Sequence, residues 1–119
     1  MKVLVVDDSA TMRKIIIRAL GAVGVSDTVQ AGDGAEAFEL FQQESFDLVL
    51  TDWNMPNKSG IDLVRDIRGS GSTIPVVMIT TEAEKGRVLE AVQAGISDYL
   101  VKPFTPEALQ QKLEKFAAV

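Results

Sequence analysis

The chain has 119 residues, of which 46% are hydrophobic and 24% are charged, and its formal net charge is −5. These values predict one globular domain with a substantial core, and the acidic balance argues against a nucleic-acid binder, which needs Lys and Arg to neutralise phosphates. The sequence contains neither Cys nor His, which excludes disulfides, thiolate chemistry and a histidine general base or metal ligand. No apolar run reaches membrane-spanning length and the amino terminus lacks a signal-peptide pattern, so we expect a cytoplasmic monomer that binds no membrane.

Apolar runs and amphipathic stretches alternate through the first half of the chain. Residues 3–6 form a continuous apolar run, which is typical of a strand covered on both faces. Ser9 is a candidate cap for the following helix. The apolar stripe that we expect this helix to bury consists of Met12, Ile15, Ile16, Ala19, Leu20 and Val23. Residues 26–31 are more polar and predict an edge strand, and Asp33 with Glu36 has the spacing of a capping box that opens a second helix.

The second half repeats this alternation. The run that begins at Asp47 contains a short apolar stretch rich in branched residues, stops at Asp52 and is followed by turn-forming residues up to 60, which predicts a buried strand and a loop. Residues 76–79 and 98–101 predict two more strands, and the residues that would cap the three remaining helices are Ser59, Thr81 (with Glu84) and Thr105. In the helix after Thr81, we expect Val88, Leu89 and Val92 to form the apolar face.

Five strand-helix units of similar length predict an α/β fold of the (βα)5 type over residues 1–119, without a linker or a second domain. Right-handed crossovers then give a doubly wound, parallel five-stranded sheet with helices on both faces. In the flavodoxin-like order 2-1-3-4-5, the switch point lies between strands one and three.

Polar side chains stand where these predicted strands end. They are Asp7, Asp8, Asp52, Thr80 and Lys102. Each has a simple alternative role, as a helix cap for the Asp and Thr residues or as a solvated charge for Lys102. The carboxyl ends of parallel strands share one edge of the sheet, however, and ligands of such folds bind there. We therefore expect these residues to form one site.

Three carboxylates in one pocket repel one another, because two unit charges ~4 Å apart interact by roughly 4 kcal/mol at an effective dielectric near 20. Oxygen ligands without His or Cys favour Mg²⁺, with Mn²⁺ or Ca²⁺ as alternatives. Such a site can bind phosphate oxygens, and Lys102 and Thr80 would stabilise them. Asp52, at the end of the central strand, is the best candidate nucleophile and would form an aspartyl phosphate.

The chain resembles the receiver domains of two-component response regulators over its whole length. The residues that carry this resemblance are Asp7-Asp8, Asp52 with Met55-Pro56, Thr80, and Lys102-Pro103-Phe104. The segments 52–56 and 98–102 are further similar to chemotaxis regulators of the CheY type. The resemblance implies that Asp52 accepts a phosphoryl group from the phosphohistidine of a separate sensor histidine kinase. It also implies that Asp7, Asp8, Asp52 and the main-chain carbonyl of Asn54 hold Mg²⁺.

The resemblance also implies a switch rather than an enzyme, because such domains promote only their own phosphorylation and dephosphorylation. Thr80 would move toward the phosphoryl group while Tyr99 turns inward, which remodels the face made by helix four, strand five and helix five. That face would bind a target, such as the flagellar motor switch protein, and a phosphatase is a further possible partner. Asn54 and Glu82 match positions that govern the hydrolysis rate, although a turn residue and a helix cap are equal alternatives for them.

Several other functions are weighed against this one. A haloacid-dehalogenase-type phosphatase would need an Asp-x-Asp arrangement after the first strand, which Asp7-Asp8-Ser9 lacks. A flavin binder would present hydroxyls and main-chain amides to phosphate, whereas the carboxylates here would repel it. A structural adaptor would not need the site, and a receiver without an output domain could also serve a phosphorelay outside chemotaxis.

Trp53, at the start of a polar loop beside Asp52, is expected to be partly exposed.

Overall fold

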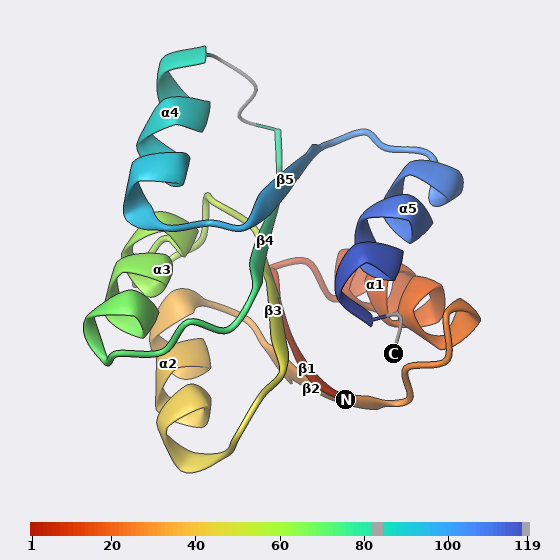
Figure 1. Cartoon of the computed structure of the whole chain (residues 1–119), viewed down its shortest axis with the longest axis horizontal. Coiled ribbons are helices and arrows are strands. Elements are labelled where there is room, and N and C mark those ends of the chain that lie inside the picture. Colours follow the sequence, from red (N-terminus) through yellow and green to blue (C-terminus); the bar gives the residue numbers. More distant parts are fainter. Residues whose placement is uncertain (82–84, 118–119) are drawn as a thin grey trace.

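Five parallel strands form one sheet between two layers of helices (Figure 1). The computed structural model describes the backbone of residues 1–81 and 85–117 and the side chains of residues 1–81 and 87–116. The strands are β1 (Lys2–Val6), β2 (Asp27–Ala31), β3 (Leu48–Thr51), β4 (Val76–Thr80) and β5 (Asp98–Val101). The helices are α1 (Ala10–Ala22), α2 (Gly34–Gln43), α3 (Gly60–Gly69), α4 (Lys85–Ala94) and α5 (Pro106–Ala117). The order β2-β1-β3-β4-β5 confirms the predicted fold.

The three inner strands are buried almost throughout, as their apolar runs predict. In β3 and β4 every residue is buried, and in β1 every residue except Lys2. β2 and β5 are the edge strands, and both carry exposed positions. The parallel register aligns Val6 of β1 with Thr51 of β3. The residues that follow these two positions, Asp7 and Asp52, therefore leave the sheet side by side.

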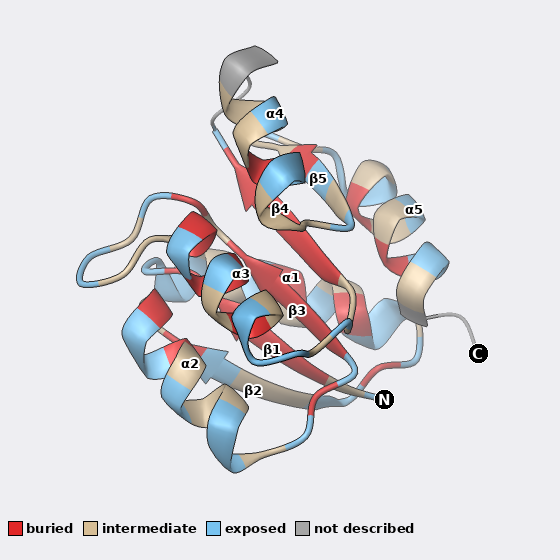
Figure 2. Ribbon diagram, turned by 60° about the vertical axis from the view of Figure 1, so that its left-hand side comes forward, coloured by how far each residue is buried: buried red, intermediate tan, exposed pale blue. Residues whose placement is uncertain are grey.

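Alternate side chains of the strands build two cores, one on each face of the sheet. Leu4, Val49 and Met78 face the layer of α2, α3 and α4, while Val5, Leu50 and Val77 face α1 and α5. Figure 2 shows the buried residues continuing along the strands and facing inward on the helices. Among the described residues, no helix is both long and apolar enough to cross a membrane.

Side-chain caps begin four of the helices at the predicted residues. The hydroxyl or carboxylate oxygens of Ser9, Asp33, Ser59 and Thr105 each accept a hydrogen bond from the backbone N–H three residues later. Each bond satisfies a helix N–H that would otherwise have no partner within the helix. The predicted capping box that begins at Thr81 includes residues 82–84, which lie outside the described part of the chain.

Two predicted apolar faces are wrong in part. Ile15 of α1 is 43% exposed, and Leu89 and Val92 of α4 are 56% and 54% exposed. α1 buries Ile16 and Leu20, and α4 contacts the core through the small side chain of Ala91, so both helices present a narrower buried stripe than their sequences suggest. Ile15 instead lines an apolar groove of about 460 Å³ between α1 and α5.

Candidate functional site: an acidic cluster at the carboxyl edge of the sheet

Three carboxylates and one ammonium group meet where β1, β3 and β5 end. Each of Asp7, Asp8 and Asp52 offers one carboxylate oxygen, and these oxygens all lie within 4.8 Å of one another. The Lys102 ammonium reaches Asp7 Oδ2 at 2.8 Å and Asp52 Oδ2 at 3.2 Å. The structure therefore places together the charged residues that the sequence assigned to separate strand ends, and it supplies a counter-charge within the cluster.

Asp7 is the buried member of the cluster, with 1% of its surface exposed. Its backbone N–H donates to the Ala31 carbonyl, which extends the pairing of β1 with β2 by one residue. The Ser9 N–H donates to Asp7 Oδ1 at 2.8 Å, and the Arg13 guanidinium donates to the Asp7 main-chain carbonyl. Asp7 is thus fixed from both sides of the β1–α1 turn, while Asp8 is exposed.

Asp52 has one carboxylate oxygen held by the backbone and one directed to Lys102. Its N–H donates to the Val6 carbonyl at 2.9 Å, and the Trp53 N–H donates to Asp52 Oδ1 at 2.7 Å. The α3 N-terminus packs tightly against this segment, because a Cβ atom added to Gly60 would lie 1.9 Å from the Asp52 carbonyl oxygen. The Gly60 N–H also donates to the Trp53 carbonyl at 2.8 Å. The start of α3 therefore fixes the turn that presents Asp52.

Burial and the charges of the cluster shift the pKa values of two members. Burial raises the pKa of Asp52 above its ordinary value and the Asp7 charge adds to this, although Lys102 and the Trp53 N–H act in the opposite direction. For Lys102, burial alone would lower the pKa. The hydrogen bond to Asp7 and the charges of Asp52 and Asp7 outweigh burial and raise the pKa instead. Lys102 is therefore protonated at neutral pH.

This donor set suits a hard divalent cation. Carboxylate oxygens are preferred ligands of Mg²⁺, and three of them within 4.8 Å can contribute to one coordination sphere. Among the described residues, no other group of three or more His, Cys, Asp or Glu side chains has this spacing. Asn54, which the resemblance adds as a main-chain ligand, lies two residues beyond Asp52 in the loop before α3 and has an exposed side chain.

The two predicted switch residues occupy different environments. Thr80 is 2% exposed at the end of β4, and its carbonyl accepts a hydrogen bond from the Lys102 N–H at 2.8 Å. Tyr99 is aligned with Met78 of β4 and is 38% exposed, so its ring lies outside the core in this structure. Glu82, which the resemblance connects with hydrolysis, lies outside the described residues.

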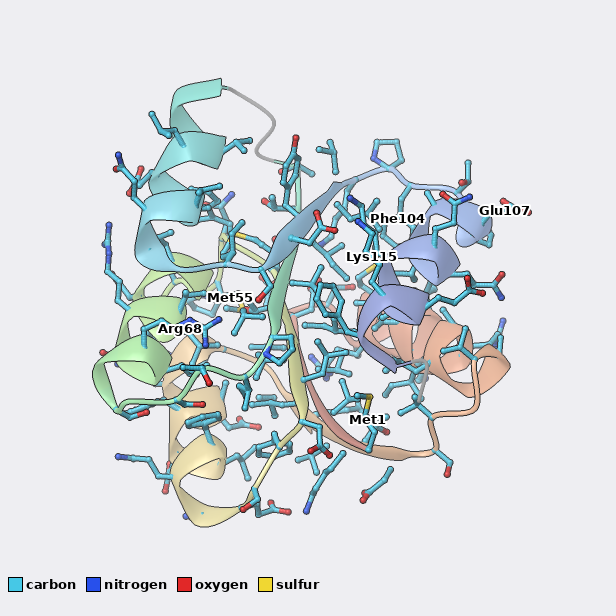
Figure 3. All side chains as sticks on the ribbon, in the orientation of Figure 1. Met1, Met55, Arg68, Phe104, Glu107 and Lys115 are labelled. Atoms are coloured by element: carbon cyan, nitrogen blue, oxygen red, sulfur yellow. The ribbon has the colours of Figure 1, made fainter. Side chains whose placement is uncertain are left out.

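The expectation that Trp53 is partly exposed is wrong, because only 3% of its surface is accessible. Trp53 belongs to the core on the side of α2, α3 and α4, and the Arg87 guanidinium of α4 lies 5.0 Å from the centre of its ring. The chain after β3 therefore turns back toward the core before it enters the polar loop. Figure 3 labels Met55, which also packs against this core.

Sequence reasoning missed three sets of contacts, two at the site and one between β5 and α5. No motif connects Arg13 with the site, but its guanidinium donates to the Asp7 carbonyl and, at 3.0 Å, to the Gln30 side chain. Gly60 lies close to Asp52, but its place at the start of a helix gives no sign of this contact in the sequence. Asp98 forms ion pairs with two lysines of α5. No local sequence pattern predicts these contacts, because the residues lie far apart along the chain.

Comparisons with known proteins show the family of the chain. Residues 3–114 match the family described as the response regulator receiver domain. The chain is 45% identical over 117 residues to the chemotaxis protein CheY of Pseudomonas aeruginosa, covering 97% of this chain and 94% of that protein. It is 49% identical over 117 residues to the chemotaxis protein CheY1 of Helicobacter pylori, covering 96% and 94%.

Solved structures give the same relationship. The chemotaxis protein CheY4 of Vibrio cholerae superimposes with a TM-score of 0.88 at 35% identity, covering 97% of both chains. The receiver domain of the Francisella response regulator 1452 superimposes with a TM-score of 0.90 at 31% identity, covering 98% of this chain and 96% of that one. The chain therefore belongs to the response regulator receiver domain family and is a receiver domain of the CheY type.

Proposed function

We propose that this receiver domain is a phosphorylation-activated switch in which Asp52 accepts a phosphoryl group from a phosphohistidine on a sensor histidine kinase. The observation that carries the proposal is the convergence of Asp7, Asp8 and Asp52 around the Lys102 ammonium. A carboxylate at the end of a central strand, beside a cation and two further carboxylates, is suited to phosphoryl transfer assisted by a metal ion.

In the transfer step, a carboxylate oxygen of Asp52 attacks the phosphorus atom of the donor. The new O–P bond forms as the P–N bond to the donor imidazole breaks, and the electron pair of that bond stays on the ring nitrogen. Asp52 Oδ2 is the better candidate for the attacking atom, because Oδ1 is held by the Trp53 N–H. Lys102 and the Thr80 hydroxyl would then bind the oxygens of the phosphoryl group.

Mg²⁺ is the proposed cofactor, and Asp7, Asp8, Asp52 and the Asn54 main-chain carbonyl are the proposed ligands. When bound, it would neutralise negative charge on the carboxylates and on the phosphoryl oxygens. The residues around it have separate tasks. Ser9 and Arg13 orient Asp7 through the β1–α1 turn, while Gly60 keeps the Asp52 turn close to α3.

The output face that we propose consists of α4, β5 and α5. Leu89, Val92 and Tyr99 are large exposed apolar residues on α4 and β5, and exposed apolar side chains are typical of protein-binding surfaces. Phosphorylation would draw Thr80 toward the phosphoryl group and turn Tyr99 inward, which changes this face. Because similar curated proteins are named chemotaxis proteins, we propose the flagellar motor switch as the target.

Phosphotransfer from a kinase tests this function. A sensor kinase from the same organism, radiolabelled on its histidine, should lose the label to the wild-type protein within the mixing time and should keep it in the presence of Asp52→Asn. Equal transfer to both proteins would contradict the assignment of Asp52. Binding of the phosphorylated protein to a kinase-associated phosphotransfer domain, but not to the motor switch protein, would place it in a phosphorelay outside chemotaxis.

A further inference from the structure

An ionic cluster joins the start of β5 to α5, away from the acidic site. The Lys112 ammonium lies 2.9 Å from Asp98 Oδ1, and the Lys115 ammonium lies 3.2 Å from Asp98 Oδ2. The Tyr99 N–H also donates to Asp98 Oδ1 at 2.8 Å. Figure 3 labels Lys115, which lies on the part of α5 that faces β5. Asp98 therefore fixes the positions of two cations that belong to another element.

One of the two lysines makes a second contact. The Lys112 ammonium lies 5.9 Å from the centre of the Tyr99 ring, which is within the range of a cation–π interaction. Its side chain is 29% exposed, against 61% for Lys115, so its ammonium is the less hydrated of the two. Lys112 thus connects the Asp98 carboxylate to the face of an aromatic ring that is itself 38% exposed.

We propose that Lys112, held in place by Asp98, is a positioning residue that keeps the Tyr99 ring in its exposed position. In this arrangement Asp98 orients the Lys112 ammonium, and that ammonium attracts the Tyr99 ring. Lys115 forms a second ion pair with Asp98 and helps to fix its position. The regulatory consequence rests on the proposed function, in which Tyr99 turns inward after phosphorylation. The contact itself does not depend on that function and can be tested in the unphosphorylated protein.

The strength of the contact determines the expected effect. A partly exposed cation–π interaction changes an equilibrium by about two- to fivefold, so loss of Lys112 should lower the ratio of exposed to inward Tyr99 by that factor. Asp98 remains ionised under ordinary conditions. Burial acts to raise its pKa, but hydrogen bonds from Lys112, the Tyr99 N–H and Lys115 outweigh burial and hold the pKa below its usual value.

The single tyrosine of the chain makes the test direct. Protein labelled with 3-fluorotyrosine should give one fluorine NMR environment, and the shift between H₂O and D₂O reports how exposed the ring is. For Lys112→Gln in the unphosphorylated protein, we expect this solvent shift to move toward the value of an inward ring. Lys112→Arg should restore the wild-type value, because its guanidinium also pairs with a carboxylate and with a ring.

Lys115→Gln is the matched control, since it removes the other ion pair of Asp98 and leaves the cation over Tyr99. It should change the solvent shift much less than Lys112→Gln does. Asp98→Asn should approach the Lys112→Gln value, because Lys112 is then no longer fixed. Equal shifts for Lys112→Gln and Lys115→Gln, or a wild-type value for Lys112→Gln, would overturn the proposal.

The phosphorylated state separates this inference from the proposed function. With acetyl phosphate as donor, the wild-type Tyr99 signal should move toward the inward value, and Lys112→Gln should complete that movement at a lower degree of phosphorylation. A wild-type signal that does not respond to phosphorylation would contradict the switch role of Tyr99. It would leave the comparison of Lys112→Gln with Lys115→Gln, which is made without phosphate, to decide the positioning role.

Discussion

Replacing Asp8 with Asn should stabilise the metal-free protein and weaken its binding of Mg²⁺. Asp8 is exposed, and its carboxylate oxygen lies within 4.8 Å of oxygens of Asp7 and Asp52. At that separation each pair of charges repels by about 0.9 kcal/mol in a water-like dielectric, so the two pairs together give about 2 kcal/mol. Attraction by the Lys102 ammonium offsets part of this repulsion, and a net gain of about 1 kcal/mol remains.

Thermal unfolding with and without Mg²⁺ measures this effect. A gain of about 1 kcal/mol corresponds to a rise in Tm of roughly 4 °C for a domain of this size. Asp27→Asn, which removes one negative charge from the exposed start of β2, is the matched control and should change Tm little. The reasoning would be refuted if Asp8→Asn melted at or below the Tm of Asp27→Asn without Mg²⁺, or if its Mg²⁺ affinity equalled that of the wild type.

Three further predictions concern Asp52 of the cluster and two residues near it. Because the pKa of Asp52 is raised in the folded protein, its ionised form costs stability above that folded pKa, and this cost disappears as the pH falls below the ordinary aspartate value. The gain in Tm from Asp52→Asn should therefore be present at neutral pH and absent in acid. A gain that is independent of pH would argue against a charge effect. Gly60→Ala places a Cβ atom 1.9 Å from the Asp52 carbonyl oxygen and should lower the free energy of unfolding, measured in urea titrations, by about 3 kcal/mol or more. A decrease in this free energy below about 1 kcal/mol would show that the start of α3 can shift freely. Arg87→Ala removes the cation from the Trp53 ring and should change the fluorescence emission of this single tryptophan before any ligand is added. Arg87→Lys should retain part of the wild-type emission. Identical spectra for all three proteins would contradict the contact.

The five strands and the convergence of the charged residues could be predicted, the strands from their apolar runs and the convergence from parallel pairing, whereas the order 2-1-3-4-5 was taken from the flavodoxin-like fold. A continuous apolar run such as residues 3–6 indicates a strand covered on both faces, and parallel strands necessarily bring their carboxyl ends together. Asp7 and Asp52 could therefore be placed side by side without knowledge of their contacts. In the structure, Val6 of β1 is aligned with Thr51 of β3, so Asp7 and Asp52 follow two paired residues.

The exposure of single residues could not be predicted in the same way. The apolar spacing of Leu89 and Val92 identifies one side of a helix, but it does not reveal how much of that side the sheet can cover. Trp53 was misplaced because its position after a strand says nothing of the direction in which the loop turns. The contacts of Lys112 with Asp98 and Tyr99 depend on how α5 packs beside β5, which no local pattern encodes.

Covalent trapping of the phosphoryl acceptor tests the central claim most directly. The protein is incubated with acetyl phosphate and Mg²⁺, reduced with borohydride to convert any aspartyl phosphate to homoserine, and mapped by peptide mass spectrometry. We predict conversion at Asp52 alone, loss of conversion when Mg²⁺ is chelated, and no conversion in Asp52→Asn. Conversion at Asp7 or Asp8 in the wild type, or none at any aspartate while the protein is folded and Mg²⁺ is present, would contradict the account.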